Sequence, residues 1–360
     1  MQNCIMISKA DLDYNVHTVL EAVQTPVIAV VKCNGYGITM QYAMAAWYNA
    51  GVRFFAVSEP AEALTIRELG YKDVQILLMA PVFDPPTLQL LLANDIILTI
   101  TSAHCAVFAV ENSGGYPIQA HVKIDTGMGR FGTRYDNIQE LLAIYTVEGI
   151  RYSGIFSHFA ISFEPQYQKT KQQLDLFLSA IRQLEAAEIQ VGTKHIANSC
   201  AAFRFPETRL DAVRIGSALV GRLMVPCGVQ LKKIGSLRAR VVDIVQLKKG
   251  DTSGYAMIAK LKKDTTAAVV AVGYRQGFGI TRCNENGRLL DMLRNIYHAI
   301  REYKKPAYLY HGKDRLPVVG RIGNQYTLVD ITGKSLDVNA ILSADINLLL
   351  ADSLVDRVLE

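Results

Sequence analysis

The sequence has no closely spaced cysteine pair, no long apolar run and no strong excess of one charge. Its six cysteines are scattered over 360 residues. That spacing argues against zinc and iron–sulfur sites and is typical of a reducing compartment. The apolar runs are of strand length, far below the roughly 20 residues that span a bilayer. The net charge of +5 is spread along the chain, which argues against a nucleic-acid groove.

The beginning of the chain also lacks a recognisable targeting signal. Met1 to Ser8 has no basic start followed by a long apolar stretch, as a secretory signal would have. Half of the residues are hydrophobic and 20% are charged, which is a globular composition. We expect a soluble cytoplasmic protein, or the cytoplasmic domain of a membrane-anchored one, with no metal, no nucleic-acid partner and no membrane contact by this segment itself.

Eight short apolar runs alternate with helix-like segments before residue 220. Continuous apolar character predicts strands buried on both faces, as in a parallel sheet. One intervening segment, Gln172 to Ala187, repeats its apolar residues with the period of a helix. Eight such units predict a (β/α)8 TIM barrel over residues 10–230, with a doubly wound sheet as the alternative. The predicted strands are Val27–Lys32, Phe54–Ser58, Ile76–Ala80, Ile97–Thr101, Ala120–Asp125, Gly154–Phe159, Lys194–Ser199 and Ala212–Gly216.

The pattern changes after about residue 230. Strand-like runs separated by Gly and Asp turns predict a smaller, mostly β C-terminal domain over residues 231–360, together with residues 1–9. A helix-like stretch, Leu289–Tyr303, interrupts the strands. The predicted strands are Leu237–Leu247, Ala267–Val272, Leu316–Ile322 and Tyr326–Ile331.

Polar side chains follow several of the barrel strands, where barrel enzymes place their active sites. Lys32 leaves an apolar strand, so its amine is desolvated and suited to Schiff-base chemistry. The alternative is a lysine whose charged end reaches solvent at a strand end. The set has neither paired carboxylates nor a Ser-His-Asp order, so a hydrolase is not favoured. Its members are Lys32, Arg130, His158, Asn198, Ser199, Arg214 and Gly216.

The sequence around Lys32 resembles a known signature. Val30–Gly37 (VVKCNGYG) is similar to the pyridoxal-phosphate motif of the alanine racemase family, in which the lysine carries the cofactor. Six further segments resemble family motifs in the same order, so the resemblance covers essentially the whole chain and is highly specific. They are Lys123–Arg130 (KIDTGMGR), Ser157–Ala160 (SHFA), Ala197–Ser199 (ANS), Val213–Gly216 (VRIG), Ser253–Ala256 (SGYA) and Gly273–Gly277 (GYRQG).

The resemblance implies catalytic roles for two residues. Lys32 would hold pyridoxal 5'-phosphate and act as the base on one face of the substrate. Tyr255 would be the base on the opposite face, reaching the site from the partner subunit of a homodimer with shared active sites. Arg214 would bond the pyridine nitrogen, with His158 orienting it.

The resemblance also implies binding roles. Arg130 would lie near the phenolic oxygen of the cofactor and the substrate carboxylate, and the family often carbamylates the position of Lys123 to brace this arginine. The remaining cofactor residues would be Tyr36, Asn198, Ser199, Gly216 and Ser217, with Tyr36, Ser199, Gly216 and Ser217 at the phosphate. The remaining substrate-binding residues would be Tyr274, Asn324 and Gln325.

The chain departs from the family in Gly320–Tyr326 (GRIGNQY). Asn324 stands where the family usually has Met, and Gln325 stands at an acidic position. A second gate tyrosine is also missing near Asp345. The change to Asn324 resembles the serine racemases of vancomycin-resistance clusters (the VanT type), whose racemase part follows a transmembrane region.

We therefore expect a racemase that converts L-serine to D-serine, and also L-alanine to D-alanine, for D-Ser-ending peptidoglycan precursors and vancomycin resistance. The alternatives are a housekeeping alanine racemase and a non-catalytic pyridoxal-phosphate carrier. A decarboxylase of the same fold type is a third, but it needs a cysteine and aspartate pair that has no clear counterpart here. The β domain that bears Tyr255 argues against the carrier, because carriers lack such a domain.

Overall fold

The computed structural model describes residues 3–164, 167–223, 225–226, 228–254, 257, 259–280, 289–303 and 307–360. The chain divides into two compact units. One unit spans Lys9–Ile234, and the other combines Met1–Ser8 with Gly235–Glu360. We refer to them as the barrel unit and the β unit and describe each by itself.

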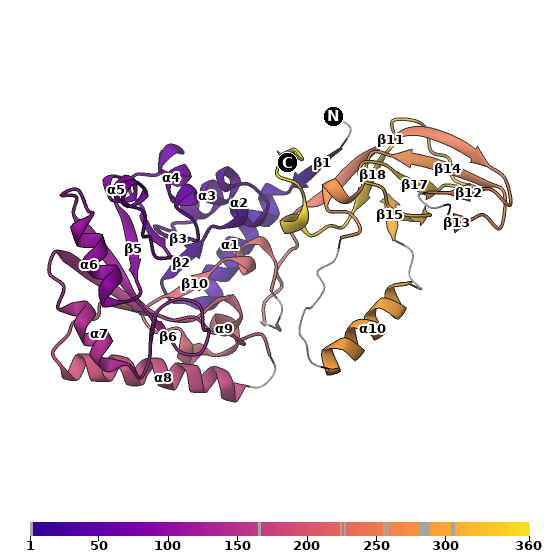
Figure 1. The fold of residues 1–360 in the computed structure, drawn as a ribbon. Helices are drawn as coiled ribbons and strands as arrows, with labels where there is room; N and C mark the ends of the chain where they lie inside the picture. Colours follow the sequence, from indigo (N-terminus) through magenta and orange to yellow (C-terminus); the bar gives the residue numbers. More distant parts are fainter. Residues whose placement is uncertain are drawn as a thin grey trace. The chain divides into compact units, whose positions relative to one another are not determined.

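The barrel unit is a ring of eight parallel strands (Figure 1). Neighbours in the ring pair in order, β10 pairs with β2, and a parallel bridge between His195 and Ala212 closes the ring. The predicted TIM barrel is confirmed, and the doubly wound alternative is wrong. The strands are β2 (Val27–Val30), β3 (Phe54–Val57), β4 (Gln75–Leu78), β5 (Ile96–Ile100), β6 (Ile118–Asp125), β8 (Ile150–Phe156), β9 (Thr193–His195) and β10 (Val213–Ile215).

Helices follow the strands and cover the outside of the ring (Figure 1). In α8 (Tyr167–Ala186), the predicted apolar face is buried, with Phe177 and Leu184 fully inaccessible to solvent. The other helices are α1 (Lys9–Val23), α3 (Met40–Asn49), α4 (Pro60–Glu68), α5 (Pro85–Ala93), α6 (Ala103–Glu111), α7 (Ile138–Tyr145) and α9 (Ser199–Arg204). Short elements complete the unit: α2 (Cys33–Tyr36), β7 (Thr133–Arg134), η1 (Pro206–Thr208) and η2 (Ser217–Val220).

The strands of the barrel contribute both an apolar and a polar set of buried residues. The apolar cluster contains Ile28, Val30, Ala56, Leu77, Ile97, Phe156 and Ala212. The polar set, His121, Lys123, His195 and Arg214, is at most 4% exposed. Buried polar groups need hydrogen-bond partners, and the partners of this set define the candidate site described below.

The β unit is built mainly from antiparallel strands. β11 (Ser236–Leu247) pairs with both β18 (Ile341–Ala344) and β14 (Thr265–Val270), so that six strands form a closed ring. The other ring strands are β15 (Tyr308–His311), β16 (Asp314–Val319) and β17 (Thr327–Asp330). The unit also contains β1 (Asn3–Ile7), β12 (Thr252–Ser253), β13 (Ala259–Lys260), β19 (Arg357–Leu359), η4 (Tyr274–Gln276) and η5 (Leu348–Leu350).

The four strands predicted for this unit correspond to β11, β14, β16 and β17. β1, β15, β18 and β19 were not predicted from the sequence. Each is three to five residues long and has no two consecutive buried positions, so it lacks the continuous apolar run that marked the barrel strands of similar length.

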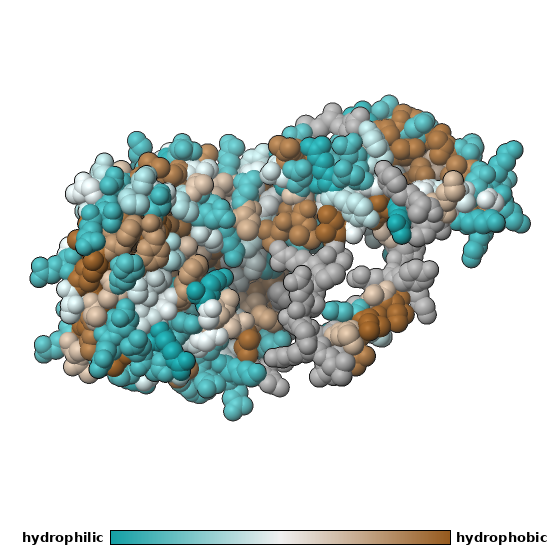
Figure 2. Space-filling model, viewed as in Figure 1, coloured by the Kyte–Doolittle hydropathy of each residue, from teal (hydrophilic) through white to brown (hydrophobic). Residues whose placement is uncertain are grey.

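The predicted helix of the β unit is α10 (Leu289–Tyr303). Apolar side chains gather on its surface (Figure 2) and are between 48% and 62% exposed: Met292, Leu293, Ile296, Tyr297 and Ile300. Across the part of the chain that the structure describes, no helix is both long and apolar enough to cross a membrane.

Candidate active site

Lys32 lies just beyond β2, at the start of a left-handed turn. Its own backbone is extended, with φ −136°, whereas Cys33, Asn34, Gly35 and Tyr36 have φ between 51° and 65°. The turn is closed by hydrogen bonds, with the Tyr36 N–H donating to Lys32 O at 2.8 Å. Left-handed backbone costs about 1–2 kcal/mol for each residue other than glycine. Strain of this kind often occurs at functional sites.

Neighbouring segments hold this strained turn in place. The Cys33 N–H donates to Oε1 of Glu62 at 2.7 Å, and Oε2 of the same carboxylate accepts from the Ser58 N–H at 2.9 Å. Oδ1 of Asn34 accepts from the Met40 N–H at 2.8 Å. Glu62 therefore links the segments that follow β2 and β3. Its role was not predicted from the sequence, because the spacing of 29 residues gives no local signal.

The residues predicted to hold the cofactor phosphate come together at the end of β10. A Cβ atom at Gly216 would lie 2.1 Å from Oη of Tyr36, so only glycine allows this contact. The Gly216 N–H donates to Oγ of Ser199 at 3.3 Å, and Ser217 begins η2. Burial raises the pKa of Tyr36, so its hydroxyl stays protonated and can donate. Hydroxyl and backbone N–H donors around a glycine are suited to a phosphate group.

Arg214 is almost completely buried at the centre of the site. Its Nη1 lies 2.6 Å from Nδ1 of His195, and its Nη2 donates to Ser157 O at 2.5 Å and lies 3.4 Å from Nδ1 of His158. Burial lowers the pKa of Arg214 to about 9, which leaves it a cation at neutral pH. Among the described residues these contacts use Nη1 and Nη2, so Nε–H is the donor left for a ring nitrogen.

Two buried histidines extend this network into the barrel. His195 lies on β9 and His121 on β6, with Nε2 of His195 and Nδ1 of His121 2.9 Å apart. The His195 ring stacks on Phe156, with planes 2° apart. Neither histidine was predicted from the sequence. The alternation of β6 does place His121 and Lys123 on one face, which is the signal that could have found His121.

The mouth of the site is rich in positive charge. Burial lowers the pKa of His158 well below its usual range, and the nearby cations Arg214, Lys123, Arg130 and Lys32 lower it further. Lys123 is buried with its Nζ 4.6 Å from the centre of the Phe156 ring, and burial lowers its pKa to about 7. Arg130 is exposed in the loop after β6. An electropositive site of this kind suits an anionic cofactor and a substrate carboxylate.

Asn198 has a structural role in addition to its predicted one. It is the N-cap of α9, where its Oδ1 accepts from the Ala201 N–H at 3.1 Å and from the Ser162 hydroxyl at 2.8 Å. Only its amide nitrogen remains to donate to a ligand. The whole predicted cofactor set therefore lies within the barrel unit, at the ends of its strands and in the segments that follow them.

The remaining predicted residues belong to the β unit. Tyr274 is 44% exposed on η4, and Asn324 and Gln325 are exposed in the loop between β16 and β17. The predicted second base, Tyr255, lies outside the described residues. No group of three His, Cys, Asp or Glu side chains able to hold a metal occurs within the described ranges.

Comparisons with known proteins agree with this arrangement. Residues 7–223 match the family model "Alanine racemase, N-terminal domain", and residues 234–353 match "Alanine racemase, C-terminal domain". Alanine racemase 1 of Caldanaerobacter subterraneus subsp. tengcongensis is 30% identical over 314 residues, which are 85% of this chain and 75% of that protein.

Solved structures show the same fold. The alanine racemase of Clostridium difficile 630 superposes with a TM-score of 0.87 at 23% identity, covering 100% of this chain and 96% of that one. A histidine racemase from Leuconostoc mesenteroides subsp. sake superposes with a TM-score of 0.82 at 21% identity, covering 100% and 98%. The fold is therefore shared by racemases whose named substrates differ.

Proposed function

The chain belongs to the alanine racemase family, and on this premise we propose that it interconverts the L and D forms of alanine and, through Asn324, of serine. It is an amino-acid racemase that depends on pyridoxal phosphate. One observation supports this assignment most directly. Lys32, on its strained turn, shares an electropositive barrel mouth with the buried cation Arg214 and the phosphate-type donors around Gly216.

The barrel unit supplies the residues that would hold the cofactor. Nζ of Lys32 would bond to it covalently, Nε–H of Arg214 would donate to its ring nitrogen, and the hydroxyls of Tyr36 and Ser199 would face its phosphate. When bound, pyridoxal phosphate stabilises the negative charge left at the substrate Cα after its proton has gone. Because Arg214 is a poor proton donor, the ring nitrogen would stay unprotonated, which limits side reactions such as transamination.

Racemisation needs a proton donor and acceptor on each face of the substrate Cα. Lys32 would serve one face, and a single residue cannot reach the other without crossing the ring. The family motif at Ser253–Ala256 assigns the second face to Tyr255. In our proposal the protein is a homodimer, and the Tyr255 that serves each active site comes from the partner subunit. Each of two active sites would then combine the barrel unit of one chain with the β unit of the other.

The substrate choice rests on two different observations. The curated relatives are alanine racemases, which supports alanine. The sequence favoured serine because Asn324 replaces the usual Met. The relatives therefore give the alternative, a housekeeping alanine racemase, the stronger support. Supply of D-serine to peptidoglycan precursors and a part in vancomycin resistance depend on serine being the main substrate.

Asn324 has the chemistry to accept a serine side chain. A methionine would present an apolar wall, and burying an unpaired hydroxyl against it costs on the order of 1–3 kcal/mol. An asparagine amide can both donate and accept a hydrogen bond. Because asparagine is shorter than methionine, it also leaves room for the methyl group of alanine. We therefore expect both substrates to be racemised, with serine favoured relative to a variant that has Met at this position.

Turnover of L-serine and L-alanine by the wild-type protein and Asn324→Met tests this proposal. Formation of each D enantiomer is followed by chiral chromatography. The serine-to-alanine ratio of kcat/KM should fall about tenfold in Asn324→Met, as one hydrogen bond of about 1.4 kcal/mol is lost. The matched control is Gln172→Met, which places the same side chain at an exposed position of α8, outside the predicted binding residues.

Three outcomes are distinct. Turnover of neither amino acid would overturn racemisation of these substrates. If alanine is turned over and the serine-to-alanine ratio of kcat/KM is unchanged in Asn324→Met, the argument for serine fails and the protein is an alanine racemase. A similar fall in Gln172→Met would show that the effect is not specific to residue 324.

A further inference from the structure

The turn that carries Tyr274 is fixed to the loop that carries Asn324. The Tyr274 N–H donates to Gly323 O at 3.0 Å, and the Arg275 N–H donates to Asn324 O at 3.2 Å. The two segments approach so closely that a Cβ atom at Gly273 would lie 2.1 Å from Gly323 O. The main chain at Asn324 therefore follows the position of η4.

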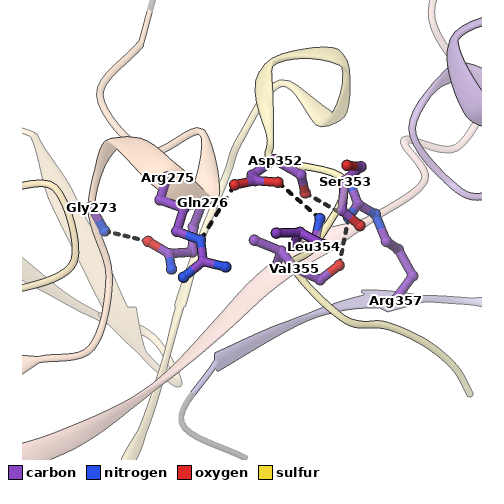
Figure 3. Close-up of polar contacts among 8 residues, drawn as sticks. All are labelled: Gly273, Arg275, Gln276, Asp352, Ser353, Leu354, Val355 and Arg357. Carbon is purple, nitrogen blue, oxygen red and sulfur yellow. Dashed lines mark hydrogen bonds and ion pairs between the residues drawn. The ribbon is translucent and has the colours of Figure 1, made fainter.

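The side chain of Arg275 ties this turn to the segment after η5 (Figure 3). Nε of Arg275 lies 3.3 Å from Oδ2 of Asp352, and the Asp352 N–H donates to Arg275 O at 3.0 Å. The two residues are 77 positions apart. Their side chains are 38% and 36% exposed, and ion pairs at this exposure contribute little to overall stability. The effect of the pair is therefore local to η4.

Asp352 is itself held in a fixed orientation (Figure 3). Its Oδ1 accepts from the Leu354 N–H at 2.9 Å, which leaves Oδ2 for Arg275. Nη1 of Arg357 donates to the carbonyl oxygen of Asp352 at 2.7 Å, and also to those of Ser353 and Val355. A carboxylate fixed on both sides can orient a guanidinium more narrowly than a mobile one.

We propose that Arg275 and Asp352 are a positioning pair that sets the main chain at Asn324 and so controls how closely its amide approaches the substrate side chain. The proposal rests on the function proposed above. Neither residue contacts the reacting atoms. The link runs from Asp352 to the Arg275 side chain, and from the Arg275 N–H to Asn324 O.

Breaking the pair should loosen the loop and weaken the preference for serine. In Arg275→Gln and Asp352→Asn, we expect the serine-to-alanine ratio of kcat/KM to fall about two- to fivefold, the range for an exposed ion pair. The loss should appear mainly in KM for serine, because the hydroxyl takes no part in the chemistry. The double variant should resemble either single variant. Arg275→Lys keeps the charge and should retain most of the preference.

Hydrogen exchange, followed by mass spectrometry on peptides containing residues 273–277, reports the Tyr274 and Arg275 N–H groups that bind the Asn324 loop. Exchange should be faster in Arg275→Gln and Asp352→Asn than in the wild-type protein. The matched control is Arg238→Gln, which breaks the Arg238–Glu360 pair of the same unit. That pair has a separation of 3.4 Å and exposures of 45% and 46%. Arg238→Gln should change neither the hydrogen exchange of residues 273–277 nor the serine-to-alanine ratio of kcat/KM.

The outcomes separate this proposal from the proposed function. Unchanged exchange in both variants would overturn the positioning role, whatever substrates are turned over. Faster exchange with an unchanged ratio would also overturn it, provided that Asn324→Met shifts the ratio. If Asn324→Met leaves the ratio unchanged, only the proposed preference for serine is overturned. The exchange data then decide alone whether the pair holds the loop.

Discussion

Nη1 of Arg214 lies 2.6 Å from Nδ1 of His195, and this contact determines the protonation of a buried histidine pair. A guanidinium can only donate, so Nδ1 of His195 accepts and its proton is on Nε2. That Nε2 lies 2.9 Å from Nδ1 of His121, which must accept in turn. Burial lowers the pKa of His195 far below its usual range and that of His121 to about 3. Both rings are therefore neutral at pH 7.

Removing either histidine should cost stability. His195→Phe removes an acceptor of the Arg214 cation, a hydrogen bond worth about 1.5–3 kcal/mol, and should lower kcat/KM as well. His121→Phe leaves His195 Nε2–H without its acceptor, which costs about 1–3 kcal/mol. Urea unfolding measures both. His17→Phe is the control. His17 is exposed, so this change should alter the free energy of unfolding by no more than about 0.5 kcal/mol. A wild-type value for His121→Phe would contradict the proposed direction of this hydrogen-bond chain.

Lys32 should be the residue that bonds the cofactor. Borohydride reduction of the protein with pyridoxal phosphate, followed by proteolysis and mass spectrometry, should place the pyridoxyl label on Lys32. The label should be absent from Lys32→Ala and unchanged in Lys72→Ala, a variant of an exposed lysine. A label on another lysine in the wild-type protein would reject the assignment.

The contact between Gly216 and Tyr36 predicts a specific effect on cofactor binding. In Gly216→Ala the new methyl group would overlap Oη of Tyr36. Overpacking costs on the order of 1–3 kcal/mol, so the Kd for pyridoxal phosphate should rise about tenfold or more. Fluorescence titration measures this Kd. Gly115→Ala is the control for a glycine-to-alanine change away from the site. A Cβ there meets no atom within 4 Å, and the backbone strain at its φ of 83° should lower stability without changing this Kd. Equal affinities in both variants would argue against a phosphate site at Gly216.

Because of Lys123, the free energy of unfolding of the cofactor-free protein should vary with pH in the alkaline range. Its pKa is lowered from 10.5 to about 7, mainly by burial and further by Arg214 and Arg130. Between these values the unfolded chain binds the proton and the folded chain does not. The free energy of unfolding should therefore rise with pH in this window, by at most about 1.4 kcal/mol per pH unit.

Lys123→Met should flatten this rise, and Lys72→Met, at an exposed position, should not. Urea unfolding between pH 7 and 10 provides the comparison. Bicarbonate-free buffer is required, because a carbamate on Nζ would remove the amine from titration. A wild-type slope in Lys123→Met would assign the pH dependence to another group.

The assignment of Tyr255 to the partner subunit predicts that two inactive variants can complement each other. Lys32→Ala and Tyr255→Phe should each lose activity, with a loss of about 10²- to 10⁴-fold for a missing acid–base group. Mixing them under conditions of subunit exchange should restore part of the activity in hybrid dimers. Mixing either variant with more of itself is the control. Absence of recovery after proven exchange would place both bases in one chain.

The sequence by itself determined the architecture of this protein, because periodicity records which faces are buried. Continuous apolar runs marked all eight barrel strands, and the helix-like stretch Leu289–Tyr303 corresponds to α10. The runs also predicted the end of each strand to within four residues, and so predicted that Lys32, His158 and Arg214 lie near one rim of the barrel. The motifs around these residues then predicted the family and its cofactor.

The tertiary structure decided the contacts between segments that are far apart in the chain. The left-handed turn of Cys33–Tyr36 is strained and persists because Glu62 and neighbouring segments hold it. Likewise, Gly216 is explained by Tyr36, 180 positions earlier, and Arg275 by Asp352. Periodicity shows that a side chain is buried, but not which group lies opposite it. That partner is set by strand pairing and close packing, so the buried histidine pair and the fixed loop at Asn324 could be found only in the folded chain.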